Sequence, residues 1–121
     1  MTLVLHQLPP LDRAPSLSPF CTKVETYLRM TGVAYRSVPT LDASSGPKGK
    51  LPFIEDDGRR LGDSRLIIEH LKRTRGDALD AHLDARARAV AVGFERMMDE
   101  HLYWAIVHSR WLDERFAPRM H

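Results

Sequence analysis

The sequence contains a single cysteine among 121 residues, so no disulfide can form within the chain. This scarcity is typical of proteins from a reducing compartment and predicts a cytoplasmic location. The sequence also lacks any apolar run near the roughly 18 residues that a membrane span requires. Its first ten residues, MTLVLHQLPP, lack the basic start of a signal peptide. We therefore expect no association with a membrane.

A strong excess of charge of one sign is absent as well. The formal net charge is +2, and the 18 lysines and arginines are scattered along the chain. Nucleic-acid-binding domains usually carry a concentrated basic patch, so we expect no nucleic-acid partner. Hydrophobic residues make up 43% and charged residues 28%, which is typical of a globular domain, here with room for an appendage.

Apolar patterning and turn residues predict a layered α/β domain in the first 76 residues. The expected order is β-α-β-loop-β-β-α, with elements at residues 2–8, 19–30, 33–38, 51–55, 59–61 and 63–73. Ser18 is a good N-cap and Pro19 suits the first position of the first helix. The loop at 40–50, TLDASSGPKGK, is polar and rich in turn residues.

The pattern changes to one long helix from Ala81 to Arg115. Gly93 interrupts the helix propensity and allows either close packing or a bend. Apolar residues recur along this helix at spacings of three and four, namely Val90, Phe94, Met97, Met98, Leu102, Ile106 and Val107. Such a stripe needs cover from the first domain, from a partner chain or from further sequence.

The stretch PSLSPFC, at residues 15–21, places two serines and the cysteine at the expected start of a helix. One interpretation is helix capping by the hydroxyl groups. The other is an anion site, because a helix N-terminus offers unpaired N–H groups and a partial positive charge that can hold a thiolate.

Three motifs resemble the N-terminal, thioredoxin-fold domain of glutathione transferases. Ser-Pro-Phe-Cys at 18–21 is similar to the Cys-Pro-Phe/Tyr-Cys site of glutaredoxins, with serine in place of the first cysteine. Lys-Leu-Pro-Phe-Ile at 50–54 resembles the strand in which this fold carries a cis-proline. Gly-Asp-Ser at 62–64 resembles the element that receives the γ-glutamyl end of glutathione. Together they most resemble the failed-axon-connections and metaxin-like branch.

This resemblance implies a thioredoxin-like fold with a four-stranded mixed sheet, followed by a long helix from a truncated all-α domain. Residues 1–76 would form the glutathione-binding domain, and residues 77–121 a partial helical domain of the transferase type. The implied function is conjugation of glutathione, the co-substrate, to a small electrophile. The family's usual pairing of chains implies a homodimer.

The resemblance also implies the roles of particular residues. Ser18, or Ser16 in the preceding loop, would hydrogen-bond the glutathione thiol as the catalytic group. The residues implied in glutathione binding are Phe20, Lys50, Leu51, Pro52, Asp63 and Ser64, with Lys48 a further candidate for the glycine carboxylate. No metal is expected, since His101 and His108 lie two helical turns apart, about 10 Å along the axis.

Other interpretations stay open beside these. Ser18, Asp63 and Ser64 each suit a helix cap, and a capping Ser18 would leave Ser16 as the thiol's partner. The chain is alternatively a non-catalytic binding or scaffold module on the same fold. Cys21 is either an inert helix thiol or the single cysteine of a redox protein.

Overall fold

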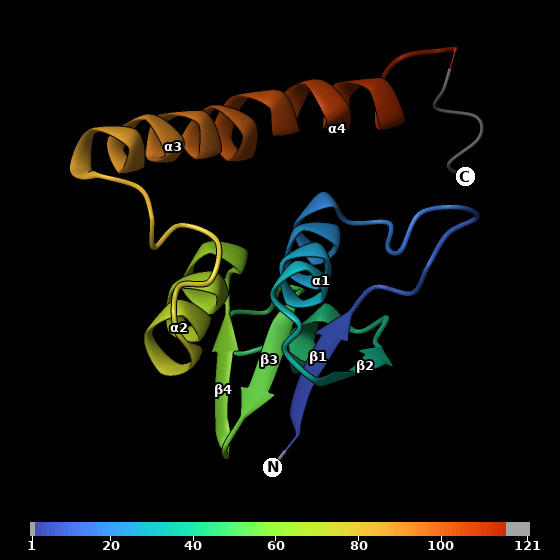
Figure 1. Cartoon of the computed structure of the whole chain (residues 1–121). Helices are drawn as coiled ribbons and strands as arrows, with labels where there is room; N and C mark the ends of the chain where they lie inside the picture. Colours follow the sequence, from blue (N-terminus) through green and yellow to red (C-terminus); the bar gives the residue numbers. More distant parts are fainter. Residues whose placement is uncertain (1, 116–121) are drawn as a thin grey trace. The chain divides into compact units, whose positions relative to one another are not determined.

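The computed structural model describes residues 2–115 (Figure 1). The chain divides into two compact units, Met1–Leu79 and Asp80–His121, and each is described by itself. The sequence predicts the boundary after residue 76. The first unit contains β1 (Leu3–Gln7), α1 (Pro19–Thr31), β2 (Tyr35–Pro39), the short 3₁₀ helix η1 (Ala43–Ser45), β3 (Phe53–Asp56), β4 (Arg59–Gly62) and α2 (Ser64–Arg75).

The four strands form one mixed sheet in the order β2-β1-β3-β4. Strands β1 and β2 are parallel, with Leu5 opposite Ser37, because α1 carries the chain back between them. Strand β3 runs antiparallel to β1, and the hairpin partner β4 runs antiparallel to β3. The predicted α/β, thioredoxin-like fold is therefore confirmed.

One face of this sheet packs against α1 and α2 to form the hydrophobic core of the first unit. Side chains alternate between the two faces of a strand, so every second residue of β1 and β3 points to the helices. The core consists of Leu3, Leu5, Val24, Tyr27, Leu28, Ile54, Ile67 and Leu71. The predicted inward faces of both helices are confirmed, including the buried His70, while Leu66 is only half buried.

The end of α1 determines where β2 begins. Gly32 adopts a left-handed conformation, with φ of 70°, and its N–H donates to the Arg29 carbonyl. The N–H of Val33 donates to the Leu28 carbonyl at 3.2 Å, which completes the glycine-terminated helix end. The sequence predicts that the second strand begins at Val33. Because Val33 takes part in ending the helix, the strand begins at Tyr35 instead.

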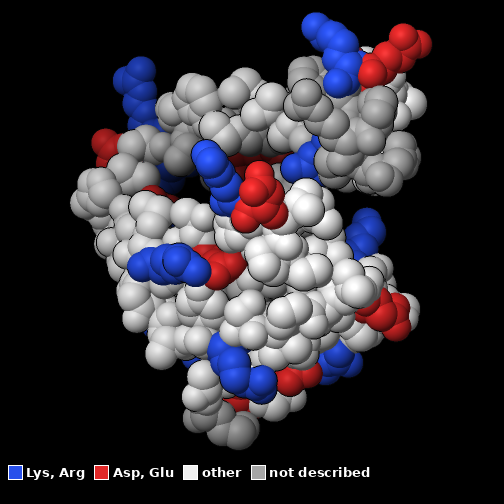
Figure 2. Space-filling model, turned by 90° about the vertical axis from the view of Figure 1, so that its right-hand side faces the viewer, with Lys and Arg blue, Asp and Glu red and all other residues white. Residues whose placement is uncertain are grey.

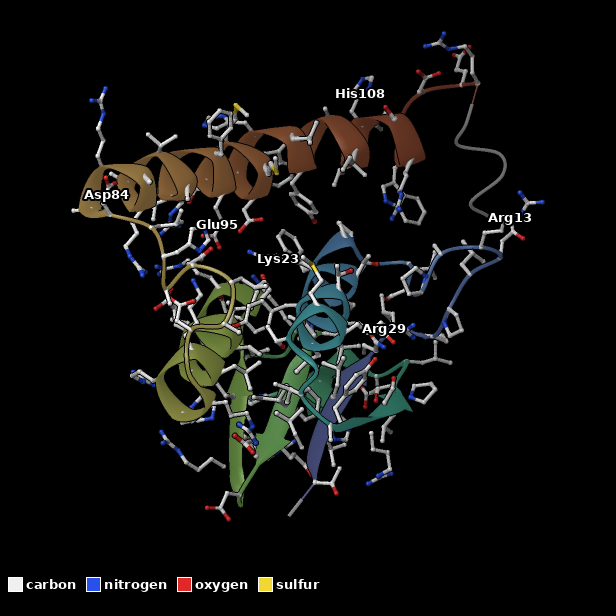
Figure 3. The ribbon with its side chains drawn as sticks, viewed as in Figure 1. Arg13, Lys23, Arg29, Asp84, Glu95 and His108 are labelled. Atoms are coloured by element: carbon white, nitrogen blue, oxygen red, sulfur yellow. The ribbon has the colours of Figure 1, made fainter. Side chains whose placement is uncertain are left out.

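The second unit contains one helical segment composed of α3 (Ala85–Met97), the π-helical turn η2 (Met98–Leu102) and α4 (Tyr103–Trp111). It begins four positions later than predicted because the Asp84 carboxylate caps it, accepting from the Ala87 N–H at 2.8 Å (Figure 3). The sequence allows a bend at Gly93, but Gly93 lies within regular α-helix. The irregular turn is at Met98–Leu102.

None of the residues of α3, η2 and α4 is buried. The predicted apolar stripe is exposed along most of its length, with Val90 at 53% and Phe94 at 56% of full exposure. Among residues 2–115, no helix has both the length and the apolarity that crossing a bilayer would demand.

Candidate functional site

The topology brings three of the predicted motifs to the same edge of the sheet. Strand β1 ends there and leads into the 8–18 loop and the N-terminus of α1. Strand β3 starts at this edge, directly after Leu51-Pro52, because it runs antiparallel to β1. Strand β4 ends there at Gly62, which is opposite Phe53, and continues into Asp63-Ser64.

The serines before α1 both accept backbone hydrogen bonds. The Ser18 hydroxyl accepts from the Cys21 N–H at 3.3 Å, which makes Ser18 the N-cap as predicted. The Ser16 hydroxyl accepts from the Ser18 N–H at 3.2 Å. A hydroxyl that accepts a bond still has its own hydrogen to donate, so capping does not exclude Ser18 from a second role. Ser16 is 3% exposed, whereas Ser18 and Phe20 are half-buried, so Ser18 is the more accessible hydroxyl.

Cys21 lies in the first turn of α1 and is completely buried. A thiol that solvent cannot reach is a poor partner for disulfide exchange, because the attacking thiolate and the target sulfur must meet. Burial therefore favours the interpretation of Cys21 as a packing residue over its use as a single redox cysteine.

The Leu51-Pro52 peptide bond is cis, as the resemblance implies. Pro52 is buried and Leu51 is half-buried, and the regular strand begins only at Phe53, two residues later than predicted. Lys48 and Lys50 are exposed on the loop that precedes this bond.

Asp63 has the unusual backbone conformation of φ 73° and ψ 118°, which a residue with a side chain rarely adopts. It serves as the N-cap of α2, and its carboxylate accepts from the N–H groups of Arg65 at 3.0 Å and Leu66 at 3.3 Å. The helix therefore starts at Ser64, which is buried, while Asp63 is exposed. Strained backbone of this kind concentrates at functional sites.

Two buried polar clusters were not predicted from the sequence. In the first, Glu25 of α1 accepts from Gln7 at 2.7 Å, Tyr35 at 2.9 Å and Arg29 at 2.9 Å. Burial raises the pKa of Glu25, but these three hydrogen bonds outweigh it, and the net pKa lies below the ordinary value. Arg29 occupies the outer surface of α1 (Figure 3).

In the second cluster, Asp56 of β3 accepts two hydrogen bonds from Arg75, each of 2.8 Å, and lies 2.8 Å from His70 Nε2. The Arg75 guanidinium, more than the His70 ring, holds the Asp56 pKa far below its usual range. Both partners come from α2, so the cluster joins the carboxyl end of β3 to that helix. Sequence patterning indicated only that His70 faces inward.

Charged side chains of both signs are interspersed on the face of the molecule in view in Figure 2. That face shows no broad area of one sign. Within residues 2–115, no three His, Cys, Asp or Glu side chains lie together as metal ligands would.

Comparison with known proteins places this geometry in a family. Residues 19–116 match the family model of the glutathione S-transferase N-terminal domain. The isoprene-epoxide–glutathione S-transferase of Rhodococcus sp. (strain AD45) is 47% identical over 106 residues, which cover 83% of this chain and 44% of that protein. Failed axon connections of Drosophila melanogaster is 39% identical over 108 residues, which cover 89% of this chain and 26% of that protein.

The fold also matches solved structures. A diazinon-metabolizing glutathione S-transferase of the silkworm Bombyx mori superposes with a TM-score of 0.73 at 18% identity, covering 100% of this chain and 62% of that one. The present chain spans less than half the length of the two relatives above. Metaxins also match, so the predicted resemblance to the failed-axon-connections and metaxin-like branch is confirmed. By the extent of the family match and the identity to these relatives, the chain belongs to the glutathione S-transferase family.

Proposed function

We propose that the first unit binds glutathione along the sheet edge where the α1 N-terminus, Leu51-Pro52 and Asp63-Ser64 meet. The observation that carries this proposal is the convergence of three separate motifs at one edge, with a strained Asp63 in one of them. Leu51 lies before the first residue of β3, so its main-chain groups can pair with an extended peptide as an added strand would. The tripeptide offers that backbone, with charged groups at both ends.

Each end of glutathione has a proposed partner. The hydroxyl and backbone N–H of Ser64 would hold the γ-glutamyl carboxylate, and the Asp63 carboxylate would attract the ammonium group. The Leu51 backbone would pair with the cysteinyl residue beside Pro52 and Phe20. Lys50, with Lys48 as the second candidate, would meet the glycine carboxylate.

The thiol would lie at the N-terminus of α1. A free thiol has a pKa near 8.5, so roughly a few per cent is thiolate at pH 7. A hydroxyl donor and the helix dipole both favour the thiolate, and each unit of pKa lowering requires about 1.36 kcal/mol. We assign the donor to Ser18 because it is more exposed than Ser16.

The proposed reaction is addition of the thiolate to a small epoxide, the substrate class named for the Rhodococcus relative. The sulfur forms a bond to one epoxide carbon while the carbon–oxygen bond there breaks. The electron pair stays on oxygen, and the resulting alkoxide takes a proton from water. Atoms and charges balance in this step, and it requires no metal or redox cofactor.

Calorimetric titration with glutathione tests the binding proposal. The double variant Asp63→Asn/Ser64→Ala should abolish the binding that the wild type shows. Asp57→Asn is the matched control, since Asp57 is also an exposed aspartate with positive φ, at 51°, but lies in the β3–β4 turn at the opposite edge. Equal affinity in the wild type and the double variant would contradict the proposed site.

A second candidate function is a non-catalytic binding or scaffold module. The exposed apolar residues of α3 favour it, because contiguous apolar surface marks interaction sites. Saturable glutathione binding without turnover of any epoxide would favour this candidate, and turnover that Ser18→Ala reduces would exclude it.

We also propose a homodimer, since the same exposed face of α3 requires cover. Size-exclusion chromatography with light scattering at micromolar concentration should give twice the mass of the chain. A monomer under these conditions would contradict the proposal.

A further inference from the structure

The sheet face that points away from α1 and α2 carries a stack of flat side chains. His6 of β1 lies opposite Phe53 of β3, and their rings stack with centroids 4.2 Å apart and planes 6° from parallel. The guanidinium carbon of Arg60, on β4, lies 4.8 Å from the centre of the Phe53 ring. This distance is within the range of a cation–π contact. Phe53 of the central strand β3 thus contacts a flat group from each neighbouring strand, and the stack of His6, Phe53 and Arg60 is called the Phe53 platform below.

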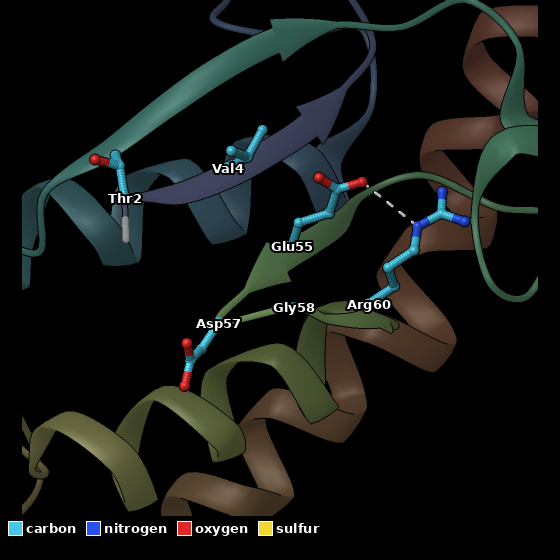
Figure 4. Close-up of a pocket in the computed structure, with 6 residues that line it drawn as sticks. All are labelled: Thr2, Val4, Glu55, Asp57, Gly58 and Arg60. Atoms are coloured by element: carbon cyan, nitrogen blue, oxygen red, sulfur yellow. Dashed lines mark ion pairs between the residues drawn. The ribbon is translucent and has the colours of Figure 1, made fainter.

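Arg60 is fixed on this platform by a second contact within the sheet. Its Nε lies 3.5 Å from Oε1 of Glu55, the residue opposite it on β3 (Figure 4). These two side chains line one pocket of about 360 Å³ together with Thr2, Val4, Asp57 and Gly58. The ion pair leaves the far end of the guanidinium, Nη2, available for another partner.

That partner belongs to a different segment. Nη2 of Arg60 donates a hydrogen bond to the backbone carbonyl of Ser45, in the loop at 42–50. The loop is also packed on the same platform, because a Cβ on Gly46 would clash with the Lys50 carbonyl and approach the Phe53 ring to 3.2 Å. Farther along, Pro47 and Lys48 lie over Gly62, within 4.0 Å of where its side chain would be.

The loop leads directly into the proposed glutathione site. Its last residue, Lys50, precedes Leu51 and the cis Pro52, and its middle lies over the residue that precedes Asp63. A displacement of the loop would therefore move the proposed peptide-pairing segment and the proposed partners of the glycine carboxylate together.

We infer that Arg60 is a positioning residue for glutathione binding, which clamps the 42–50 loop to the Phe53 platform and so sets the position of Lys50-Leu51. This inference rests on the function proposed above. Arg60 itself makes no contact with glutathione: its planar group joins Phe53, Glu55 and the Ser45 carbonyl at once, which a planar, multi-donor guanidinium can do and a lysine cannot.

The first test measures loop order without glutathione, by hydrogen exchange. The N–H groups of Ser45, Gly46 and Gly49 bond to carbonyls within the loop. In Arg60→Met, exchange at these amides should rise about tenfold, as loss of roughly one charge-assisted hydrogen bond predicts. Arg59→Met is the matched control, because Arg59 is also exposed on β4 but its side chain points to the other face of the sheet.

The second test measures glutathione affinity and turnover in the same proteins. Arg60→Met should raise the Kd or KM for glutathione about five- to tenfold while kcat at saturating glutathione changes less than about twofold. Arg60→Lys should recover only part of this loss. Gly46→Ala should weaken affinity similarly, since it displaces the loop by a clash and leaves Arg60 intact.

The outcomes separate this inference from the proposed function. If the wild type binds no glutathione, the proposed function fails, and the positioning role fails with it. If the wild type binds but Arg60→Met matches Arg59→Met in exchange and affinity, only the clamp is wrong. Faster loop exchange with unchanged affinity would likewise overturn the positioning role.

Discussion

Leu28 of the first unit is completely buried, whereas Phe94 of the second is 56% exposed, although both are large apolar residues on helices. The contrast extends to the polar groups. In the first unit, Asp56 and Glu25 are buried and hydrogen-bonded by partners from other elements. In the second, the pair of Arg96 with Glu100 at 2.8 Å connects neighbouring turns of one helical segment.

Most of the stability of the chain therefore resides in the first unit. Long-range contacts between strands and helices hold the first unit, and hydrophobic burial is the main favourable term in folding. The second unit has the regular backbone of a helix without a buried face, and isolated helices are marginal in water. We therefore expect the first unit to dominate cooperative unfolding, while the second depends on whatever covers its apolar stripe.

The largest expected effect comes from truncating a core side chain. Leu28→Ala should lower the free energy of unfolding by about 3 kcal/mol, because it removes buried contacts and leaves a cavity. Phe94→Ala should change it by less than about 0.5 kcal/mol, since exposed positions contribute little. Urea denaturation of both variants, at a concentration where the chain is monomeric, measures the two values. Equal losses of stability would show that Phe94 is buried by a contact and would contradict the difference between the two units.

A smaller effect should follow from removing the partner of Asp56. Arg75→Met should lower the free energy of unfolding by about 2 kcal/mol, because it leaves the buried Asp56 carboxylate without its guanidinium partner while the contact with His70 remains. The folded-state pKa of Asp56 lies below its ordinary value of 3.8. The stability that ionised Asp56 contributes is thus fully present above pH 3.8 and is lost as the pH falls below 3.8 toward the folded-state pKa.

Thermal unfolding between pH 2 and pH 7 checks this prediction for the wild type and Arg75→Met. The difference in melting temperature between the wild type and Arg75→Met should become smaller toward low pH. Arg73→Met is the control, because Arg73 is exposed in the same last turn of α2. A difference in melting temperature that stays constant over this pH range would contradict the assigned role of Asp56.

The smallest effects are expected at the helix caps. Ser18→Ala should reduce global stability by about 1 kcal/mol, the usual contribution of an N-cap. Asp84→Ala removes an equivalent cap, with an Oδ1 to Ala87 N–H distance of 2.8 Å, but from the second unit. We expect it to reduce helicity by circular dichroism without shifting the main unfolding transition. A shift equal to that of Ser18→Ala would indicate that both units unfold together.

Local chemistry made much of the fold and part of the site predictable. The cap at Ser18 and the start of α1 at Pro19 depend on residues close in sequence, and both are as predicted. The element ends were less accurate where neighbours compete: Val33 bonds to the end of α1, and Asp63 caps α2 instead of joining it.

The contacts that depend on distant residues could not be read from the sequence. No local pattern indicates that Arg60 reaches the Ser45 carbonyl, 15 positions away, or that Arg75 reaches Asp56, 19 positions away. The sequence also could not predict which of Ser16 and Ser18 is more exposed to solvent, because burial depends on the whole surrounding structure. The π-helical turn at Met98–Leu102 has no sequence signal such as a proline, and Gly93, which suggested a bend, lies in regular α-helix.

The order of strands and helices, the caps and the three motifs that indicate the family follow from the sequence alone, because each depends on side chains interacting with their own neighbouring backbone. Only the folded chain shows which motifs meet at one sheet edge, which serine is accessible and which arginine contacts the loop beside the proposed site. These properties arise only when strands pair and bring together residues far apart in the chain, so that geometry and burial are set by the fold as a whole.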